Sequence, residues 1–97
     1  MSLAPRSYAG QIFSETISSQ DRGLLYGDGV FETVRCQHGR LILWDLHQQR
    51  LLSACCALGL TVERDDLDRM IADAIIQAPS SDCIMKVIVT RGVGGRG

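Results

Sequence analysis

The chain has 97 residues, of which 45% are hydrophobic and 22% charged, and its net charge is −1. This composition fits one small globular domain and argues against a nucleic-acid partner, which would need a basic surface. The sequence has neither an apolar run long enough to cross a bilayer nor the basic and apolar regions of a secretory signal. We therefore expect a cytoplasmic protein without a membrane partner.

The four cysteines show no CxxC spacing, and the two histidines lie at no recognisable ligand distance from them. Cysteines of an intracellular protein are usually reduced and serve as small core residues. The sequence therefore predicts neither a metal site nor a disulfide.

The first half of the chain predicts strands joined by turns. Residues 8–17 predict a first strand or hairpin, and the polar residues 18–21 predict a turn. Residues 29–36 alternate as a strand does, His38-Gly39 predicts a tight turn, and residues 40–43 predict the partner strand.

Two helices are expected next. Asp45 is a favoured N-cap residue for a helix that ends near Leu58, with Gly59 in the C′ position. A second helix must end before Pro79. Its apolar residues recur at i, i+3, i+4, i+7 and i+8, which places one stripe against the core. These residues are Leu67, Met70, Ile71, Ala74 and Ile75.

Residues 83–90 are nearly all apolar and rich in β-branched side chains, so they predict a strand that is buried on both faces. The order β-β-β-α-α-β then predicts an α+β fold, with a mostly antiparallel sheet and two helices packed on one side. The chain ends in a glycine-rich loop over residues 91–97. We therefore expect residues 1–97 to be the N-terminal small domain of a longer protein.

The most informative segment is DRGLLYGDGVFETVR, residues 21–35, which has three glycines within seven residues. Glycine permits positive φ and a close approach of the backbone. In the strand that follows, alternation places Glu32 on one face and Phe31 and Arg35 on the other. Charge on both faces is unusual for a plain core strand.

This segment resembles the signature of the fold-type-IV pyridoxal-phosphate enzymes, which are the branched-chain and D-amino-acid aminotransferases and the aminodeoxychorismate lyases. The resemblance covers nearly the whole chain from Asp21 onward. It implies pyridoxal 5'-phosphate (PLP) as cofactor and a homodimer. It also implies a catalytic Schiff-base lysine beyond Gly97, in a larger C-terminal domain. The only lysine, Lys86, does not match that residue, so we expect the isolated chain to be inactive.

Arg50 is the candidate for cofactor binding. In an apolar helix row such an arginine usually snorkels to the surface or pairs with a carboxylate, but its rigid fork also suits a phosphate. The family has an arginine on this helix that holds the cofactor's phosphate, preceded by a short polar stretch and followed by leucine. Residues 47–51, HQQRL, match that pattern, so the resemblance implies that Arg50 binds the phosphate.

The candidates for substrate binding are Tyr26, Phe31, Arg91 and Arg96. Two arginines on a glycine-rich loop can bind an anionic substrate or form a solvated basic loop, and the two aromatic residues can line a pocket or lie in the core. The closing loop resembles that of the aminodeoxychorismate lyases, whose chorismate-derived substrates carry two carboxylates. In the D-amino-acid branch, the arginine that matches Arg96 serves the partner subunit's site, and a tyrosine stands where this chain has Phe31.

The resemblance thus implies a lyase that eliminates pyruvate from 4-amino-4-deoxychorismate and forms 4-aminobenzoate for folate biosynthesis. One alternative is a fold-type-IV aminotransferase acting on branched-chain or D-amino acids. The other, since the family's lysine is not in the chain, is a non-catalytic folding or interaction fragment.

Overall fold

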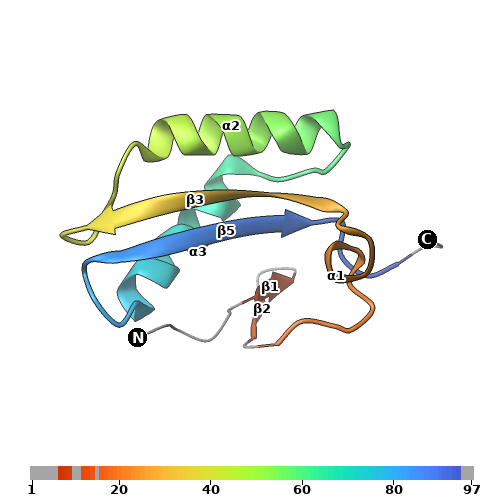
Figure 1. Cartoon of the computed structure of the whole chain (residues 1–97), viewed down its shortest axis with the longest axis horizontal. Coiled ribbons are helices and arrows are strands. Elements are labelled where there is room, and N and C mark those ends of the chain that lie inside the picture. Colours follow the sequence, from red (N-terminus) through yellow and green to blue (C-terminus); the bar gives the residue numbers. More distant parts are fainter. Residues whose placement is uncertain (1–6, 10–11, 15, 95–97) are drawn as a thin grey trace.

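A computed structural model describes residues 7–9, 12–14 and 16–94, with side chains for residues 16–94 (Figure 1). Its elements in chain order are β1 (Ser7–Ala9), β2 (Ile12–Ser14), α1 (Arg22–Tyr26), β3 (Gly29–Gln37), β4 (Arg40–Leu41), α2 (Trp44–Ala57), α3 (Arg64–Gln77) and β5 (Cys83–Thr90).

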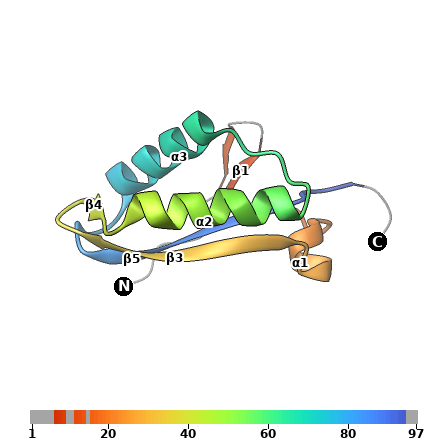
Figure 2. The same ribbon diagram turned by 90° about the horizontal axis from the view of Figure 1, so that it is seen from above.

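The main sheet is antiparallel, with the strand order β4-β3-β5. Strand β5 pairs with β3 along its whole length, from Gly29 opposite Thr90 to Cys36 opposite Cys83. The predicted N-terminal hairpin forms as β1 and β2, which make a separate antiparallel pair. Seen from above, α2 and α3 lie on the same side of the main sheet (Figure 2). The predicted α+β fold is therefore confirmed.

The core lies between this face of the sheet and the two helices. Leu51 of α2 and Leu67 and Ile71 of α3 form its centre, and Val34 of β3 is fully buried. The apolar stripe predicted for α3 is also confirmed, because Met70 and Ile75 pack against this centre and Ala74 is half-buried.

A buried polar side chain connects the two helices. Gln48 of α2 donates to a carboxylate oxygen of Asp68 on α3 at 2.6 Å and accepts from Arg64 Nη1 at 3.2 Å. Trp44 Nε1 donates to the same Asp68 oxygen at 3.3 Å. These contacts satisfy the polar atoms of Gln48, which is 2% exposed, and fix α2 against α3.

The glycines before β3 serve two different purposes. Gly27 ends α1 in the left-handed conformation, with φ of 66°. Gly29 has no positive φ, but a Cβ built there would lie 2.5 Å from the backbone oxygen of Val89. Close approach of β5 therefore requires glycine at this position.

Two helix starts differ from the prediction. No helix was expected directly after Asp21, but Arg22–Tyr26 form the short helix α1, capped by the Asp21 carboxylate, which accepts from Gly23 N at 2.8 Å. Asp45 is not the N-cap of α2, because Leu43 takes that position with φ of 57° and Asp45 lies in the first turn. The left-handed turn at Leu43 also shortens the strand predicted over residues 40–43 to Arg40–Leu41. Gly59, with φ of 71°, follows α2 as predicted.

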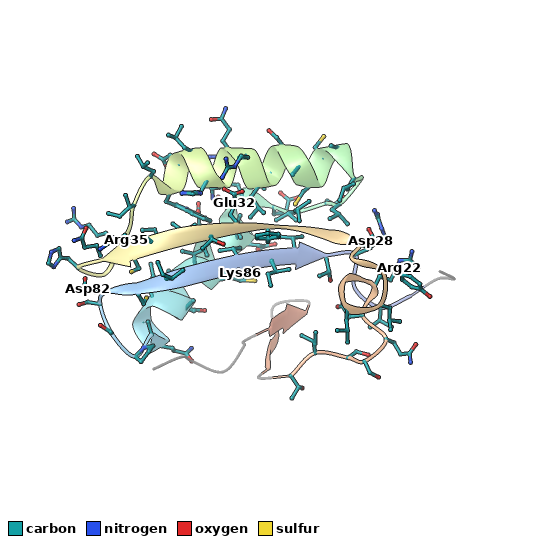
Figure 3. All side chains as sticks on the ribbon, in the orientation of Figure 1. Arg22, Asp28, Glu32, Arg35, Asp82 and Lys86 are labelled. Atoms are coloured by element: carbon teal, nitrogen blue, oxygen red, sulfur yellow. The ribbon has the colours of Figure 1, made fainter. Side chains whose placement is uncertain are left out.

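The prediction that both faces of residues 83–90 are buried was wrong. Ile84 and Ile88 are 65% and 60% exposed, because α2 and α3 cover only the opposite face of β5. Lys86 shares this open face (Figure 3). Its ammonium lies 4.5 Å from the centre of the Phe31 ring rather than against a carboxylate.

All four cysteines are free thiols. Cys36 and Cys55 are buried, as expected for small core residues, and burial raises the pKa of both thiols. Cys83 is half-buried opposite Cys36. Cys56 is exposed, so the expectation of a core position was wrong for this residue.

Candidate functional site

A buried carboxylate on β3 holds the predicted phosphate-binding arginine. Glu32 lies between β3 and α2, on the face of the strand that meets the helices (Figure 3). Arg50 Nε donates to both carboxylate oxygens of Glu32 at 3.0 Å, and its Nη2 donates to Oε1 at 2.8 Å. His47 Nδ1, one turn earlier on α2, lies 2.7 Å from the same Oε1.

This pairing uses only one edge of the guanidinium. Glu32 is 7% exposed, whereas the side chain of Arg50 is 72% exposed. Because Nε and Nη2 share one edge of the planar group, the edge formed by Nη1 and the second Nη2 hydrogen remains. Nη1 has no hydrogen-bond partner among the described residues. The arginine therefore pairs with a carboxylate and still presents a forked donor outward.

The local charges stabilise one another. Hydrogen bonds from Arg50, followed by the contact with His47, lower the pKa of the Glu32 carboxyl below its usual value of 4.5. The same pairing raises the pKa of Arg50. Both groups are thus charged at neutral pH, and the buried carboxylate has in Arg50 a charged partner that compensates its loss of water.

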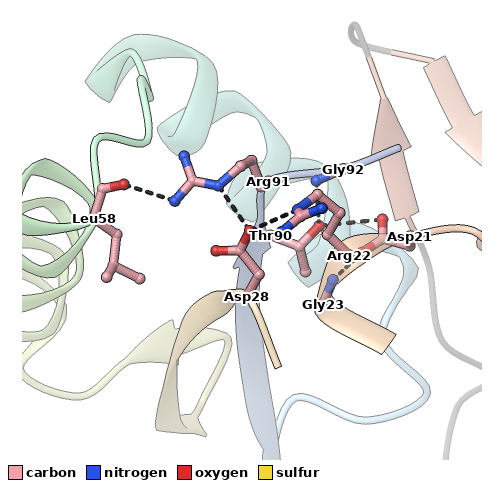
Figure 4. Close-up of polar contacts among 8 residues, drawn as sticks. All are labelled: Asp21, Arg22, Gly23, Asp28, Leu58, Thr90, Arg91 and Gly92. Carbon is pink, nitrogen blue, oxygen red and sulfur yellow. Dashed lines mark hydrogen bonds and ion pairs between the residues drawn. The ribbon is translucent and has the colours of Figure 1, made fainter. Parts of the chain in front are cut away.

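A second carboxylate organises the end of the sheet (Figure 4). Asp28, just before β3, accepts from Arg91 Nε at 2.7 Å and from Arg22 Nε at 3.0 Å, both on the same oxygen. These bonds lower the pKa of the Asp28 carboxyl. Arg91 also donates from Nη2 to the backbone oxygen of Leu58 at 2.7 Å, which ties the end of β5 to the end of α2.

Next to this cluster, Asp21 fixes α1 against the same strand end. Its Oδ2 accepts from Thr90 Oγ1 at 3.1 Å, and Thr90 Oγ1 in turn accepts from Gly92 N at 3.1 Å. The backbone N–H of Arg22 donates to the Gly92 oxygen at 2.8 Å. Asp21 and the start of α1 thus anchor the beginning of the closing loop.

The structure does not gather the predicted site residues into one pocket within its described part. Tyr26 and Arg91 lie near Asp28, Tyr26 with the Arg22 guanidinium 4.8 Å from its ring centre. Arg50 lies farther away on α2, about 12 Å along the helix axis from Leu58, whose backbone oxygen binds Arg91. Phe31 lies on the open face of the sheet, 59% exposed, opposite the face of Glu32. Arg96 lies outside the described residues.

Two further groups belong to the site but were not among the predicted site residues. Glu32 places a carboxylate in the row of Val30 and Val34, on a face that the helices cover. The alternation of the strand already placed Glu32 on this face, but its partner Arg50 could not be identified from the spacing in the sequence. His47 was considered in the sequence only as one of the polar residues before Arg50, and no contact was predicted for it.

The described residues show neither a metal-binding group nor a membrane-spanning helix. They contain no group of three or more His, Cys, Asp or Glu side chains that could hold a metal ion. Across the same residues, no helix has the length and apolar character needed to cross a membrane.

Most of the chain matches a known protein family. Residues 29–97, which include β3, β4, α2, α3 and β5, match the model of the family described as amino-transferase class IV. The chain belongs to this family. The resemblance inferred from residues 21–35 and 47–51 is therefore confirmed at the level of the family.

Relatives in this family carry more than one activity in their names. Over 85 residues the chain is 34% identical to a protein of Methanocaldococcus jannaschii that is provisionally named a branched-chain-amino-acid aminotransferase, covering 84% of this chain and 29% of that protein. The solved 4-amino-4-deoxychorismate lyase from Pseudomonas aeruginosa is 37% identical, with a TM-score of 0.68 over 84% of this chain and 30% of that one. A hypothetical aminotransferase from Mycobacterium tuberculosis, solved in a PLP-bound form, is 27% identical, with a TM-score of 0.73 over the same shares.

Each of these proteins is much longer than the segment it shares with this chain. The chain spans 29% to 30% of their lengths. The comparisons thus establish the family and its fold for this segment, in a family that includes a PLP-bound member.

Proposed function

We propose that residues 1–97 form the N-terminal domain of a PLP-dependent 4-amino-4-deoxychorismate lyase, which releases pyruvate and forms 4-aminobenzoate. The observation that carries this proposal is the outward edge of Arg50, held in place by Glu32 on a helix that the family model covers. The 37% identity to a solved lyase, against 27% to a solved aminotransferase, supports the lyase branch.

The described residues fit a phosphate group. The exposed edge of Arg50 has the forked geometry that binds two phosphate oxygens at once. PLP, when bound, supplies an electron sink for the substrate. We assign to this chain the binding and orientation of the phosphate through Arg50, and we place the catalytic lysine in a larger domain beyond residue 97.

We further propose that Arg91 and Arg96 serve the carboxylates of the substrate in a homodimer, with Tyr26 and Phe31 lining the site. Arg91 uses Nε and Nη2 for Asp28 and Leu58, so Asp28 would position it for this role. Phe31 lies on the open face of the sheet and can contact substrate only if the complete site extends to that face.

The second candidate function is a PLP-dependent aminotransferase. It is favoured by the names of the Methanocaldococcus and Mycobacterium relatives. The same phosphate-binding role of Arg50 would apply, but the amino group would pass to a keto acid rather than remain on the aromatic product.

Product analysis of the complete PLP-loaded protein separates the two candidates. With 4-amino-4-deoxychorismate we expect pyruvate and 4-aminobenzoate in equal amounts, and no amino transfer from amino acids to 2-keto acids. Amino transfer without pyruvate release would favour the second candidate. Neither reaction in protein that has bound PLP would contradict both.

A further inference from the structure

We propose that Glu32 is a positioning residue for the cofactor's phosphate, acting through Arg50. In this role it holds the inner edge of the guanidinium so that the outer edge meets the ligand. The inference rests on the proposed function, because it presumes that Arg50 binds a phosphate.

The first argument is the placement of Glu32. The residue is 7% exposed and belongs to β3, which pairs with β5 from Gly29 to Cys36. Burying a carboxylate costs free energy unless it is paired, and here both oxygens accept hydrogen bonds from Arg50. The contact of His47 with Oε1 restrains the carboxylate from a second position on α2. Glu32 is thus a fixed acceptor on a rigid element.

The second argument is the exposure of the arginine. A side chain that is 72% exposed would sample many rotamers in the absence of a partner. Binding a ligand would then restrict the side chain to one rotamer, at a cost in conformational entropy. An arginine that is already held in its bound geometry avoids most of this cost. The three N–H···O contacts to Glu32 restrict Arg50 before any ligand arrives.

The negative charge of Glu32 acts in the opposite direction, since it weakens the attraction between Arg50 and a phosphate. That charge, however, lies on the far side of the guanidinium from its outer edge. The outer edge is in contact with water, where electrostatic interactions are strongly screened. We therefore expect orientation to outweigh charge, so that removing the carboxylate lowers phosphate affinity.

The experiment measures how much of the cofactor's affinity comes from its phosphate. The complete protein, freed of cofactor, is titrated with PLP and with pyridoxal, which lacks the phosphate, and the ratio of the two dissociation constants is compared between variants. The variants are Arg50→Ala, Glu32→Gln and the double variant. Asp28→Asn is the matched control, since it removes a carboxylate that also holds two basic side chains on the same stretch of chain.

In Arg50→Ala we expect the preference for PLP over pyridoxal to fall roughly 10- to 100-fold, as for a lost charged hydrogen-bond pair. In Glu32→Gln it should fall roughly 3- to 10-fold, the scale of one side chain that must now be ordered on binding. In the Arg50→Ala background, Glu32→Gln should have no further effect, because Glu32 acts through Arg50. Asp28→Asn should leave the preference unchanged.

Different results would contradict the phosphate role of Arg50 and the positioning role of Glu32. An unchanged preference in Arg50→Ala refutes the phosphate role of Arg50 and the inference with it. A loss in Arg50→Ala with no loss, or a gain, in Glu32→Gln overturns only the positioning role. An equal loss in Asp28→Asn would assign the effect to general destabilisation and also overturn it. If Glu32→Gln does not fold, Glu32→Asp, which withdraws the carboxylate by one methylene, is judged by the same criteria.

Discussion

At the scale of single residues, two carboxylates determine where the arginines of this domain lie. Glu32 holds Arg50, and Asp28 holds Arg22 and Arg91. In both cases hydrogen bonds from the basic partners lower the pKa of the carboxyl. The positions of Arg50 and Arg91 therefore depend on a few residues at the start of β3.

The lowered pKa of Glu32 predicts how stability changes with pH. Protonation is harder in the folded chain than in the unfolded one, so the ion pair stabilises fully above the usual pKa of 4.5. This contribution is lost as the pH falls through the lower pKa of the folded state. The free energy of unfolding should therefore fall more steeply on acidification in the wild type than in Glu32→Gln, as urea titrations at a series of pH values would show. Parallel pH profiles would contradict this assignment.

The position of Lys86 predicts that it is not a specific PLP-binding residue. Its side chain lies on the open face of the sheet, over Phe31, and no described residue is recorded as its carboxylate partner. Borohydride trapping on the isolated chain should show labelling only with PLP in excess, and pyridoxal should label equally well. Lys86→Arg keeps the cation over the ring and serves as control. A one-to-one PLP product at equimolar concentration that Lys86→Arg abolishes would contradict our interpretation, as would catalytic activity of the isolated chain.

The sequence predicted part of this site. It identified Arg50 and the charged glycine-rich run, because residue type and order carry those signals. It did not identify Glu32 as the partner of Arg50, since the two are far apart in the chain and meet only when α2 packs on β3. Alternation placed Glu32 on the covered face, but pairing across elements is a property of the folded chain.

At the scale of elements, the amphipathic stripe of α3 carries much of the packing. Leu67 is fully buried in the core centre, whereas Ile76 on the same helix is 80% exposed. Leu67→Ala should lower the free energy of unfolding by about 2 to 5 kcal/mol, because it leaves a cavity. Ile76→Ala should change it by less than about 0.5 kcal/mol. Equal effects in urea denaturation would show that α3 does not pack as described.

The elements also show what local sequence can and cannot predict. The periodicity of the apolar residues predicted α3, and the β-branched residues predicted β5 with the observed bounds, Cys83–Thr90. Composition could not tell which face of β5 would be covered, because strand propensity reflects packing against neighbours that the sequence of one strand does not identify. The start of α2 was also missed. Asp45 is a favourable cap, but the chain enters the helix through a left-handed turn at Leu43.

At the scale of the whole molecule, the helices cover one face of the main sheet and leave the other open (Figure 2). Phe31, Ile84 and Ile88 lie on the open face. The chain spans 29% to 30% of the lengths of the relatives compared. In our proposal, this domain contributes Arg50 to the phosphate site of the complete protein.

The proposed dimer makes a prediction about Arg96. If Arg96 serves the partner subunit's site, Arg96→Ala in the complete protein should raise KM for the dicarboxylate substrate and leave PLP affinity nearly unchanged. Mixing this variant with one that lacks the catalytic lysine should restore activity. In such heterodimers, one site carries both defects and the other carries neither. Verified heterodimers that remain inactive would show that Arg96 does not act across the interface.

In our proposal, Arg50 holds the phosphate of PLP while Glu32 holds Arg50. A crystal structure of the complete protein with PLP bound would test this arrangement. We expect a phosphate oxygen within about 2.7 to 2.9 Å of the Nη atoms of Arg50, with Nε still bonded to Glu32. A phosphate bound elsewhere, with Arg50 directed away from it, would contradict the claim.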